Sequence, residues 1–344
     1  MNRNAVLLAI FVLVLGILGA WFIQSRLGET PVPTRSEPIP PPVSPSGELP
    51  KLGPMPEIAG IAAWLNSPPL TREDLKGKVV LIDFMTYSCI NCIRTFPYTN
   101  AWHDKYKDDG LLIIGMHTPE FEFEKDADNV RKALAQFGIT FPVALDNDYV
   151  TWNHFNNQYW PAKYLFDRDG ILRYRHFGEG RYEETEEAIQ QLLGVKEDVV
   201  RSAVPDFGNI RSPETYFGLA RGERFASPEP ARRDQASAYS LPKTLSPNAW
   251  ALSGDWIVRD EYAESAGTGA ALSFRFYAGT ANLVMASADG MPKSVIAAID
   301  GNGIGAGPVA ESTLYEFRAE APGDHTLTLT LDPGVRVYAI TFGE

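Results

Sequence analysis

The longest apolar run of the chain lies at its amino terminus. Residues 5–23 read AVLLAIFVLVLGILGAWFI, without a charged side chain. About 20 apolar residues in a helix cross a bilayer core of roughly 30 Å, so the run predicts a transmembrane helix over residues 5–25. A cleaved secretory signal is the alternative, but the run is long for one and Leu18-Gly19-Ala20 is a poor cleavage pattern. Arg3 precedes the run, and we expect a single-pass membrane protein with its soluble part on the extracytoplasmic (periplasmic) side.

A proline-rich segment follows the apolar run. Residues 28–56 contain ten prolines, from Pro31 to Pro56. Proline fixes φ and lacks an amide hydrogen, so such a segment stays extended and does not pack. We therefore interpret residues 28–56 as a linker, which at about 3.1 Å per residue reaches on the order of 80 Å from the membrane.

Between residues 57 and 200, short apolar runs alternate with segments of helical spacing. The clearest run, residues 79–84, is apolar except for Asp83, which is typical of a strand buried on both faces. Further strands are expected at 111–116, 143–145, 162–167 and 171–177, and helices at 89–106, 127–137, 149–157 and 183–193. This alternation predicts an α/β domain over residues 57–200.

The carboxy-terminal third has a different period. Apolar side chains occupy every second position in two stretches, Leu272-Phe274-Phe276 and Leu327-Leu329-Leu331. Turn sequences stand at residues 300–301 and 332–334. Period two with such turns predicts an antiparallel all-β sandwich over residues 244–344, joined to the first domain by a polar connecting segment at 201–243.

Composition and charge narrow the function classes. The 344 residues are 44% hydrophobic and 22% charged, as in globular proteins. The net charge of −12 argues against a nucleic-acid partner, because phosphate contacts need a basic surface. The chain has two cysteines, both in one motif, which excludes a scaffold held by several disulfides.

The candidate chemistry is the motif Cys89-Ile90-Asn91-Cys92, which follows the strand at 79–84 and opens a helix. A cysteine at a helix start lies at the positive end of the macrodipole, which favours its thiolate. With two residues between them, the second cysteine can reach back and close a disulfide. We expect Cys89 to attack and Cys92 to resolve. The redox group is then the cysteine pair itself, and we expect no cofactor and no metal.

Two other kinds of site use the same cysteine spacing. A structural zinc site needs four Cys or His ligands, whereas the histidines at 103, 117, 154 and 176 are scattered without ligand spacing. A purely structural disulfide between Cys89 and Cys92 closes a loop too small to contribute much stability. Both alternatives are therefore weaker than a redox-active pair.

The residues around the motif resemble the thioredoxin superfamily. Asp83 lies six residues before Cys89, where thioredoxins carry a buried acid, and Pro97 lies eight residues after Cys89, at the kink of their active-site helix. The resemblance implies that Asp83 accepts the proton of Cys92. The alternative for Asp83 is a paired carboxylate at a strand end.

Trp160-Pro161 precedes an apolar stretch at the place where the thioredoxin family has a cis-proline. The resemblance implies that Pro161 is cis, lies against the cysteines and shapes the substrate groove. It also implies that the backbone of Trp160 pairs with the substrate, next to Ile90 and Asn91 of the motif. The alternative for the side chain of Trp160 is that it belongs to the hydrophobic core and does not contact the substrate.

Longer stretches resemble the carboxy-terminal region of DipZ-type proteins. They are residues 117–130, 145–164, 177–186 and 212–227. The long segment between 116 and 160 is similar to that of TlpA-like and cytochrome c maturation thioredoxins. The resemblance implies a thioredoxin-like domain followed by a jelly-roll domain like a carbohydrate-binding module.

DipZ-type proteins begin with a multi-span electron conductor. Here a single span replaces it, so a separate membrane donor such as a multi-span thiol conductor is expected to reduce the dithiol.

The second domain offers weaker signals. The glycine-rich residues 301–307 are not followed by a helix or a lysine, which favours a hairpin over a nucleotide loop. Asp300 and Asn302 form at most a weak calcium site. Trp250, Trp256 and Tyr262 are either a stacking surface for a glycan or core residues.

The leading hypothesis is a thiol–disulfide oxidoreductase that acts on protein thiols or disulfides. The dipeptide between the cysteines, with its apolar Ile90, lacks the histidine that helps strongly oxidising relatives stabilise their thiolate, which favours a protein-disulfide reductase. A thiol peroxidase is an alternative, because Thr86 and Cys89 match a T-x-x-C pattern, although Ile82 replaces the proline that peroxiredoxins have before it. A binding protein in which the β domain is primary is a further alternative.

Overall fold

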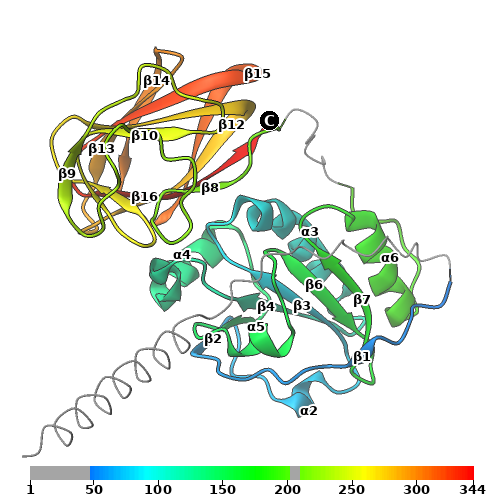
Figure 1. Cartoon of the computed structure of the whole chain (residues 1–344). Helices are drawn as coiled ribbons and strands as arrows, with labels where there is room; N and C mark the ends of the chain where they lie inside the picture. Colours follow the sequence, from blue (N-terminus) through cyan, green and yellow to red (C-terminus); the bar gives the residue numbers. More distant parts are fainter. Residues whose placement is uncertain (1–46, 202–209) are drawn as a thin grey trace, which may run out of the picture. The chain divides into compact units, whose positions relative to one another are not determined.

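The computed structural model describes residues 47–201 and 210–344 (Figure 1), which belong to one compact unit. The predicted transmembrane helix over residues 5–25 and the linker up to residue 46 lie outside the described residues. Within 47–201 and 210–344, no helix has the length and apolar character needed to cross a membrane.

The first domain is built on a seven-stranded mixed sheet with the order β1-β7-β6-β3-β4-β5-β2. The central strand β3 pairs in parallel with β4 and antiparallel with β6. The strands are β1 (Gly53–Pro54), β2 (Ala63–Leu65), β3 (Val79–Met85), β4 (Leu111–His117), β5 (Val143–Leu145), β6 (Ala162–Phe166) and β7 (Ile171–Phe177). The helices are α2 (Arg72–Leu75), α3 (Ile90–Tyr106), the 3₁₀ turn η1 (Glu122–Lys125), α4 (Ala127–Gln136), α5 (Val150–His154) and α6 (Tyr182–Leu193).

Strand β3 divides the core of this domain into two layers. Successive side chains of a strand point to opposite faces. Leu81 and Met85 pack with α3, α4 and α6, whereas Ile82 and Phe84 pack with α5. Figure 1 shows the sheet between α3 and α6 on one side and α5 and α2 on the other. Asp83 has the parity of Leu81 and Met85, so its side chain belongs to the face that carries α3.

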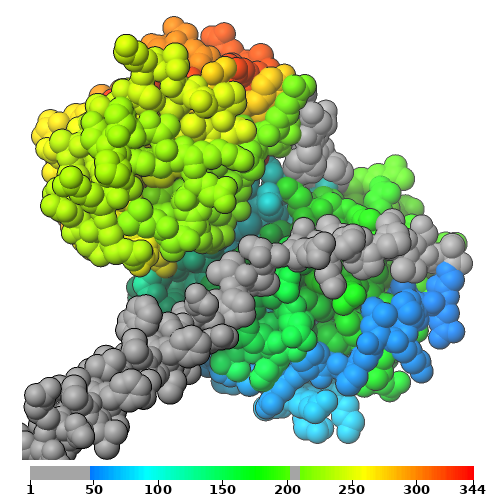
Figure 2. All heavy atoms as spheres, in the orientation of Figure 1, coloured from blue at the N-terminus to red at the C-terminus, as the bar shows by residue number. Residues whose placement is uncertain are grey.

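The predicted α/β domain is confirmed, and its largest deviation lies at its start. Backbone hydrogen bonds join Leu52 to Leu172 and Met55 to Gly170, and β1 pairs with β7. Leu49 is buried, while Leu52 is 48% exposed on a segment that runs over the surface of the domain (Figure 2, blue). The prediction of an unpacked linker is therefore wrong for these last residues, because their amides and Leu49 find partners on the domain.

The second domain consists of strands, and all of its named strand pairs are antiparallel. The long strand β12 pairs with β10 along its first half and with β16 along its second half, while β15 follows it throughout. The strands are β8 (Thr215–Tyr216), β9 (Ala236–Tyr239), β10 (Trp250–Val258), β11 (Ala263–Ser265), β12 (Ala270–Ser287), β13 (Lys293–Ile299), β14 (Asn302–Val309), β15 (Thr313–Leu331) and β16 (Val335–Gly343).

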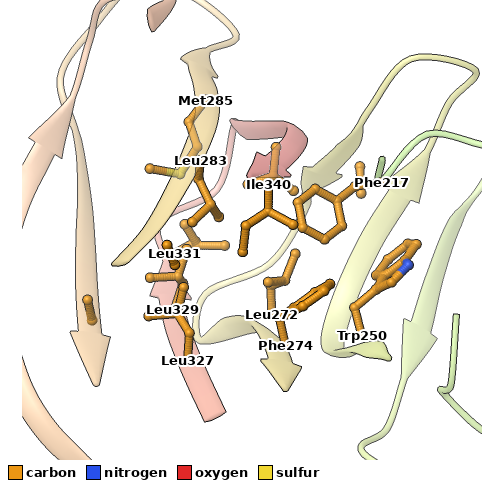
Figure 3. Packing of buried hydrophobic residues seen from close by; sticks show 14 of the residues in the cluster. Phe217, Trp250, Leu272, Phe274, Leu283, Met285, Leu327, Leu329, Leu331 and Ile340 are labelled. Carbon is orange, nitrogen blue, oxygen red and sulfur yellow. The ribbon is translucent and has the colours of Figure 1, made fainter. Parts of the chain in front are cut away.

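The alternating residues of the sequence form the core of this all-β domain. Leu272 and Phe274 of β12 and the leucines at 327, 329 and 331 of β15 are at most 2% exposed and pack together (Figure 3). Residues 299 and 302 pair across the turn from β13 to β14, which confirms the predicted hairpin. Trp250 and Trp256 are 2% and 0% exposed, so they are core residues.

Candidate active site

The dithiol lies where β3 leads into α3. Cys89 is the N-cap residue of α3 and is partly exposed, whereas Cys92 is in its first turn and is 0% exposed. Both cysteines are free, and the interaction with Cys92 raises the pKa of the Cys89 thiol. Pro97 lies inside α3, as expected. The structure therefore places the two sulfur atoms together, with only Cys89 open to a partner.

The electrostatic surroundings of Cys89 differ from the expectation. The hydrogen bond with Cys92 raises the pKa of the Cys89 thiol, and burial and the carboxylates of Glu120 and Glu214 raise this pKa further. The helix N-terminus acts in the opposite direction. The position of Cys89 at the start of the helix, taken alone, predicts a favoured thiolate. The fold adds a second thiol and two acids, so the protonated form of Cys89 is favoured in the reduced protein.

The Trp160–Pro161 peptide bond is cis, as the resemblance implied. Ala162, the next residue, pairs with Phe84 on β3, so Pro161 lies at the end of β3 from which the chain continues to Cys89. The indole Nε1 of Trp160 donates to the carbonyl of Thr118 (3.0 Å), and the side chain is half-buried. Pro161 therefore shares this end of the sheet with the dithiol.

The two residues between the cysteines differ in accessibility. Ile90 is only 9% exposed, whereas Asn91 is half-buried. The amide oxygen of Asn91 lies 3.5 Å from Nη1 of Arg94, one turn further along α3. Of the two predicted substrate contacts, Asn91 is thus the more accessible one.

Asp83 is a buried acid with a buried partner. Lys163 Nζ donates to Asp83 Oδ1 at 3.0 Å, and both side chains are 2% exposed. The two residues are opposite each other on β3 and β6. Burial raises the pKa of Asp83, and the ammonium of Lys163 acts against this rise. The paired state was the alternative considered for Asp83, and it is the one the structure shows.

Sequence reasoning missed Lys163. The signal was a single charge in the apolar run AKYLF, matching the single charge in VVLIDFM. Two lone opposite charges on buried strands are best satisfied by pairing with each other. The pairing itself requires that β3 and β6 are neighbouring strands, and no local sequence pattern indicates this.

A second buried acid, Glu124, was also missed. It lies on η1, is 0% exposed, and accepts a hydrogen bond from the hydroxyl of Ser88 at 2.6 Å. Ser88 directly precedes Cys89. Nothing in the acidic stretch PEFEFEKD distinguishes this glutamate from its neighbours, so the sequence offered no signal for it.

Residues of the all-β domain contact the loop next to the dithiol. Tyr216 and Arg221 both donate to the Glu120 carboxylate at 2.8 Å. The rings of Phe121 and Tyr338 are 5.1 Å apart. The backbone oxygen of Phe342 accepts from Nη2 of Arg94 on α3 at 3.2 Å. The second domain thus borders the candidate site.

Metal ligation has no support among the residues that the structure describes, where no three His, Cys, Asp or Glu side chains are grouped for it. His117 is fully buried, and burial lowers its pKa to about 3, so the ring is neutral. Its Nε2 lies 3.4 Å from the hydroxyl of Thr86. Asp300, considered for calcium, instead contacts His325 at 2.7 Å.

Comparison with known families assigns both domains. A family model described as Redoxin matches residues 53–193, and one described as Thioredoxin like C-terminal domain matches residues 212–343. Protein DipZ of Mycobacterium bovis is 36% identical over 318 residues, which cover 87% of this chain and 44% of that protein. The chain thus spans less than half the length of this relative.

Smaller relatives match the first domain. The thiol-disulfide oxidoreductase YkuV of Bacillus subtilis is 37% identical over 145 residues, which cover 42% of this chain and 97% of that protein. A crystal structure of a putative thiol:disulfide interchange protein DsbE from Chlorobium tepidum is 28% identical, with a TM-score of 0.33, over 36% of this chain and 84% of that one. The similarity to YkuV over nearly its whole length shows that the chain belongs to the thioredoxin-like thiol–disulfide oxidoreductases, and it is also a relative of DipZ.

Proposed function

We propose that the chain is an extracytoplasmic, membrane-anchored protein-disulfide reductase that works through Cys89 and Cys92. The observation that carries the proposal is the unequal access to the two thiols. Cys89 is partly exposed at the start of α3, whereas Cys92 is fully buried beside it. A substrate disulfide therefore reacts with Cys89 first, and Cys92 reacts in the second step.

The reaction follows from this arrangement. The Cys89 thiolate attacks one sulfur of the substrate disulfide, which forms a mixed disulfide and releases the other substrate sulfur as a thiolate that takes up a proton. Cys92 then loses its proton and attacks the Cys89 sulfur. This step releases the second substrate thiol and leaves an oxidised Cys89–Cys92 pair. Two electrons have passed from the dithiol to the substrate.

Asp83 is the proposed acceptor of the Cys92 proton, directly or through water. Its side chain is on the face of β3 that packs against α3, and Cys92 belongs to the same core layer as Leu81 and Met85. Burial raises the pKa of Asp83, which makes it a stronger base than an exposed aspartate. Lys163 then stabilises the ionised form before the transfer.

The substrate groove is proposed to run along Pro161, the backbone of Trp160 and the accessible residue Asn91. Pro161 and the dithiol share one end of the sheet. A strand of substrate that pairs with the Trp160 backbone would present its disulfide to Cys89. Ile90, at 9% exposure, contributes at most its edge to such a groove.

The membrane partner is part of the proposal. Residues 5–25 are proposed to anchor the chain, and a membrane electron donor such as a multi-span thiol conductor is proposed to return two electrons to the oxidised pair. The resemblance to DipZ-type proteins, which carry a multi-span electron conductor, is the support for such a pathway. A role in cytochrome c biogenesis stays a prediction from the TlpA-like resemblance.

The all-β domain is proposed to be a jelly-roll sandwich like a carbohydrate-binding module. Glycan binding stays a prediction from that resemblance. Two of the three aromatic side chains considered for stacking, Trp250 and Trp256, are in the core. The ring of the third, Tyr262, lies 5.0 Å from that of Tyr338 and 4.8 Å from the guanidinium of Arg336.

Trapping in native membranes tests the function. The C92A variant should accumulate mixed disulfides on Cys89 with substrate proteins, because the resolving thiol is gone. The matched C89S variant should accumulate none. Mixed disulfides on Cys92 in C89S, or their absence from both variants, would overturn the assigned roles. Fast, saturable consumption of hydrogen peroxide by Cys89 would favour a thiol peroxidase instead.

A further inference from the structure

The carboxylate of Glu124 joins two segments that meet in front of the dithiol. Its Oε1 accepts from the hydroxyl of Ser88 at 2.6 Å and from the backbone N–H of Ser88 at 3.3 Å. Its Oε2 accepts from the backbone N–H groups of Glu120 at 2.6 Å and Phe121 at 3.1 Å. Glu124 is 0% exposed, so water does not replace any of these partners.

Only half of these bonds are explained by the local turn. The bond from the N–H of Phe121 to Glu124 is part of the capping box that begins η1, and the neighbouring N–H of Glu120 serves the same end. A capping role accounts only for the hydrogen bonds to Oε2. Oε1 accepts instead from Ser88, which is 36 residues away in the chain and directly precedes Cys89.

The donors around Glu124 determine where a proton can go. A backbone N–H only donates, so Oε2, which faces two of them, has no place for a proton. At Oε1 the hydroxyl of Ser88 can donate to a carboxylate or accept from a carboxylic acid. The 2.6 Å separation is typical of a hydroxyl bonded to an ionised carboxylate. Protonation of Glu124 therefore reverses its bond to Ser88 and frees the hydroxyl hydrogen for another acceptor.

The groups that face Glu124 set its ionisation. Burial raises the pKa of Glu124 to about 7, and the negative charge of Glu120 acts in the same direction, while hydrogen bonds from Ser88 and Thr86 oppose the rise. Glu120 is itself bound by Arg221 and Tyr216 of the all-β domain. The Glu124 carboxylate also interacts with Tyr87 and Tyr149, and the neutral ring of His117 is stacked on that of Tyr87.

We propose that Glu124 is a positioning residue for the dithiol, which holds Ser88 and thereby the backbone that presents Cys89, and whose protonation changes the reactivity of Cys89. The inference rests on the proposed function in one respect, namely that Cys89 is the attacking thiol. Glu124 acts through Ser88 and does not touch the substrate.

The test measures Cys89 alone. In the full chain carrying C92A, the rate of alkylation of Cys89 by iodoacetamide is followed between pH 5 and pH 11, because the pKa of the Cys89 thiol is raised. We expect two inflections, one from the thiol itself and one near pH 7 from Glu124. Adding Glu124→Gln should remove the inflection near pH 7, since the amide does not titrate. The matched control Glu122→Gln changes an exposed acid of the same turn and should keep both inflections.

A second variant covers the case in which Glu124→Gln does not fold. Ser88→Ala removes the hydroxyl but keeps the backbone N–H, and it should also remove the inflection near pH 7. A pH profile that is unchanged in Glu124→Gln, or in Ser88→Ala when Glu124→Gln is unfolded, would overturn the positioning role while the trapping result stands. Absence of any alkylation at Cys89 in the C92A parent would overturn the proposed function and this inference together.

Discussion

The two domains bury polar groups of different kinds. In the first domain, six acidic, basic or histidine side chains are almost fully buried: Asp83, His117, Glu124, Asp146, Lys163 and Glu186. In the described part of the all-β domain, the buried polar side chains are neutral serines, threonines and one asparagine. Burying a charge costs several kcal/mol unless it is paired and hydrogen-bonded. The first domain buries several such groups and needs partners for them, whereas the described part of the second domain does not.

Position explains part of this difference. Asp83 and Lys163 pair on the face of the sheet that packs against α3, and Glu124 binds Ser88, the residue that precedes Cys89 in the sequence. A buried charge does not by itself mark a site, however. Glu186 on α6 accepts from Trp102 Nε1 at 3.0 Å and from the hydroxyl of Tyr106 at 2.6 Å, and so ties α6 to α3. The chemistry lies where buried charge and an accessible thiol coincide.

The largest expected effect comes from breaking the buried pair. Lys163→Met leaves Asp83 buried without its partner, which should lower the free energy of unfolding by about 4 kcal/mol at pH 8. The loss should be smaller at pH 5. Burial already raises the pKa of Asp83, and without Lys163 it rises further. The folded state then holds a proton that the unfolded state releases, so stability falls as the pH rises above the ordinary aspartate pKa of about 4.

Chemical denaturation of the purified chain at the two pH values measures this effect. The control is the double variant Asp83→Leu with Lys163→Met, which replaces the pair by apolar groups and should recover most of the lost stability. Equal stability of Lys163→Met at pH 5 and pH 8 would mean that Asp83 is not the titrating group. The contrast between the two domains would then lose its main example.

Truncation in the all-β core should cost somewhat less and show no such pH dependence. Leu329 is 0% exposed and lies opposite Leu272 on β12 and Ala297 on β13. Leu329→Ala leaves a cavity and should lower the free energy of unfolding by about 3 kcal/mol, equally at pH 5 and pH 8. A pH-dependent loss, measured by the same denaturation, would show that ionisable groups contribute to this core after all.

The smallest effect is expected from the neutral polar pairs of the second domain. The hydroxyls of Ser273 and Thr328, which are opposite each other on β12 and β15, lie 3.2 Å apart. Ser273→Ala should cost about 1 kcal/mol, because one neutral hydrogen bond is lost. Thr330→Ala, at an exposed position of β15, is the matched control and should change stability by at most about 0.5 kcal/mol. A loss in Ser273→Ala as large as that in Lys163→Met would remove the distinction between neutral and charged burial.

Local pattern was sufficient for much of the fold. β5 and β7 have the bounds expected from the sequence, and β3 differs from its expected range by one residue. Short β-branched runs, helical spacing and period two each reflect which face of an element is buried, and this is a property of neighbouring residues. The all-β hairpin at residues 299–302 followed in the same way. β1 was missed because its pairing with β7 joins segments that are far apart along the chain, which the local pattern of prolines does not indicate.

The candidate site likewise contains some features that local sequence predicts and others that depend on tertiary contacts. The two cysteines at a helix start, a lone acid on a buried strand and a Trp160-Pro161 turn could be predicted from the amino-acid sequence, because motif spacing is local. The pairing of Lys163 with Asp83, the bond from Ser88 to Glu124 and the effect of two acids on the pKa of Cys89 emerge only in the folded chain. Each of these depends on which distant segments lie together, and electrostatic interactions depend on distance in space and burial, which spacing along the chain does not specify.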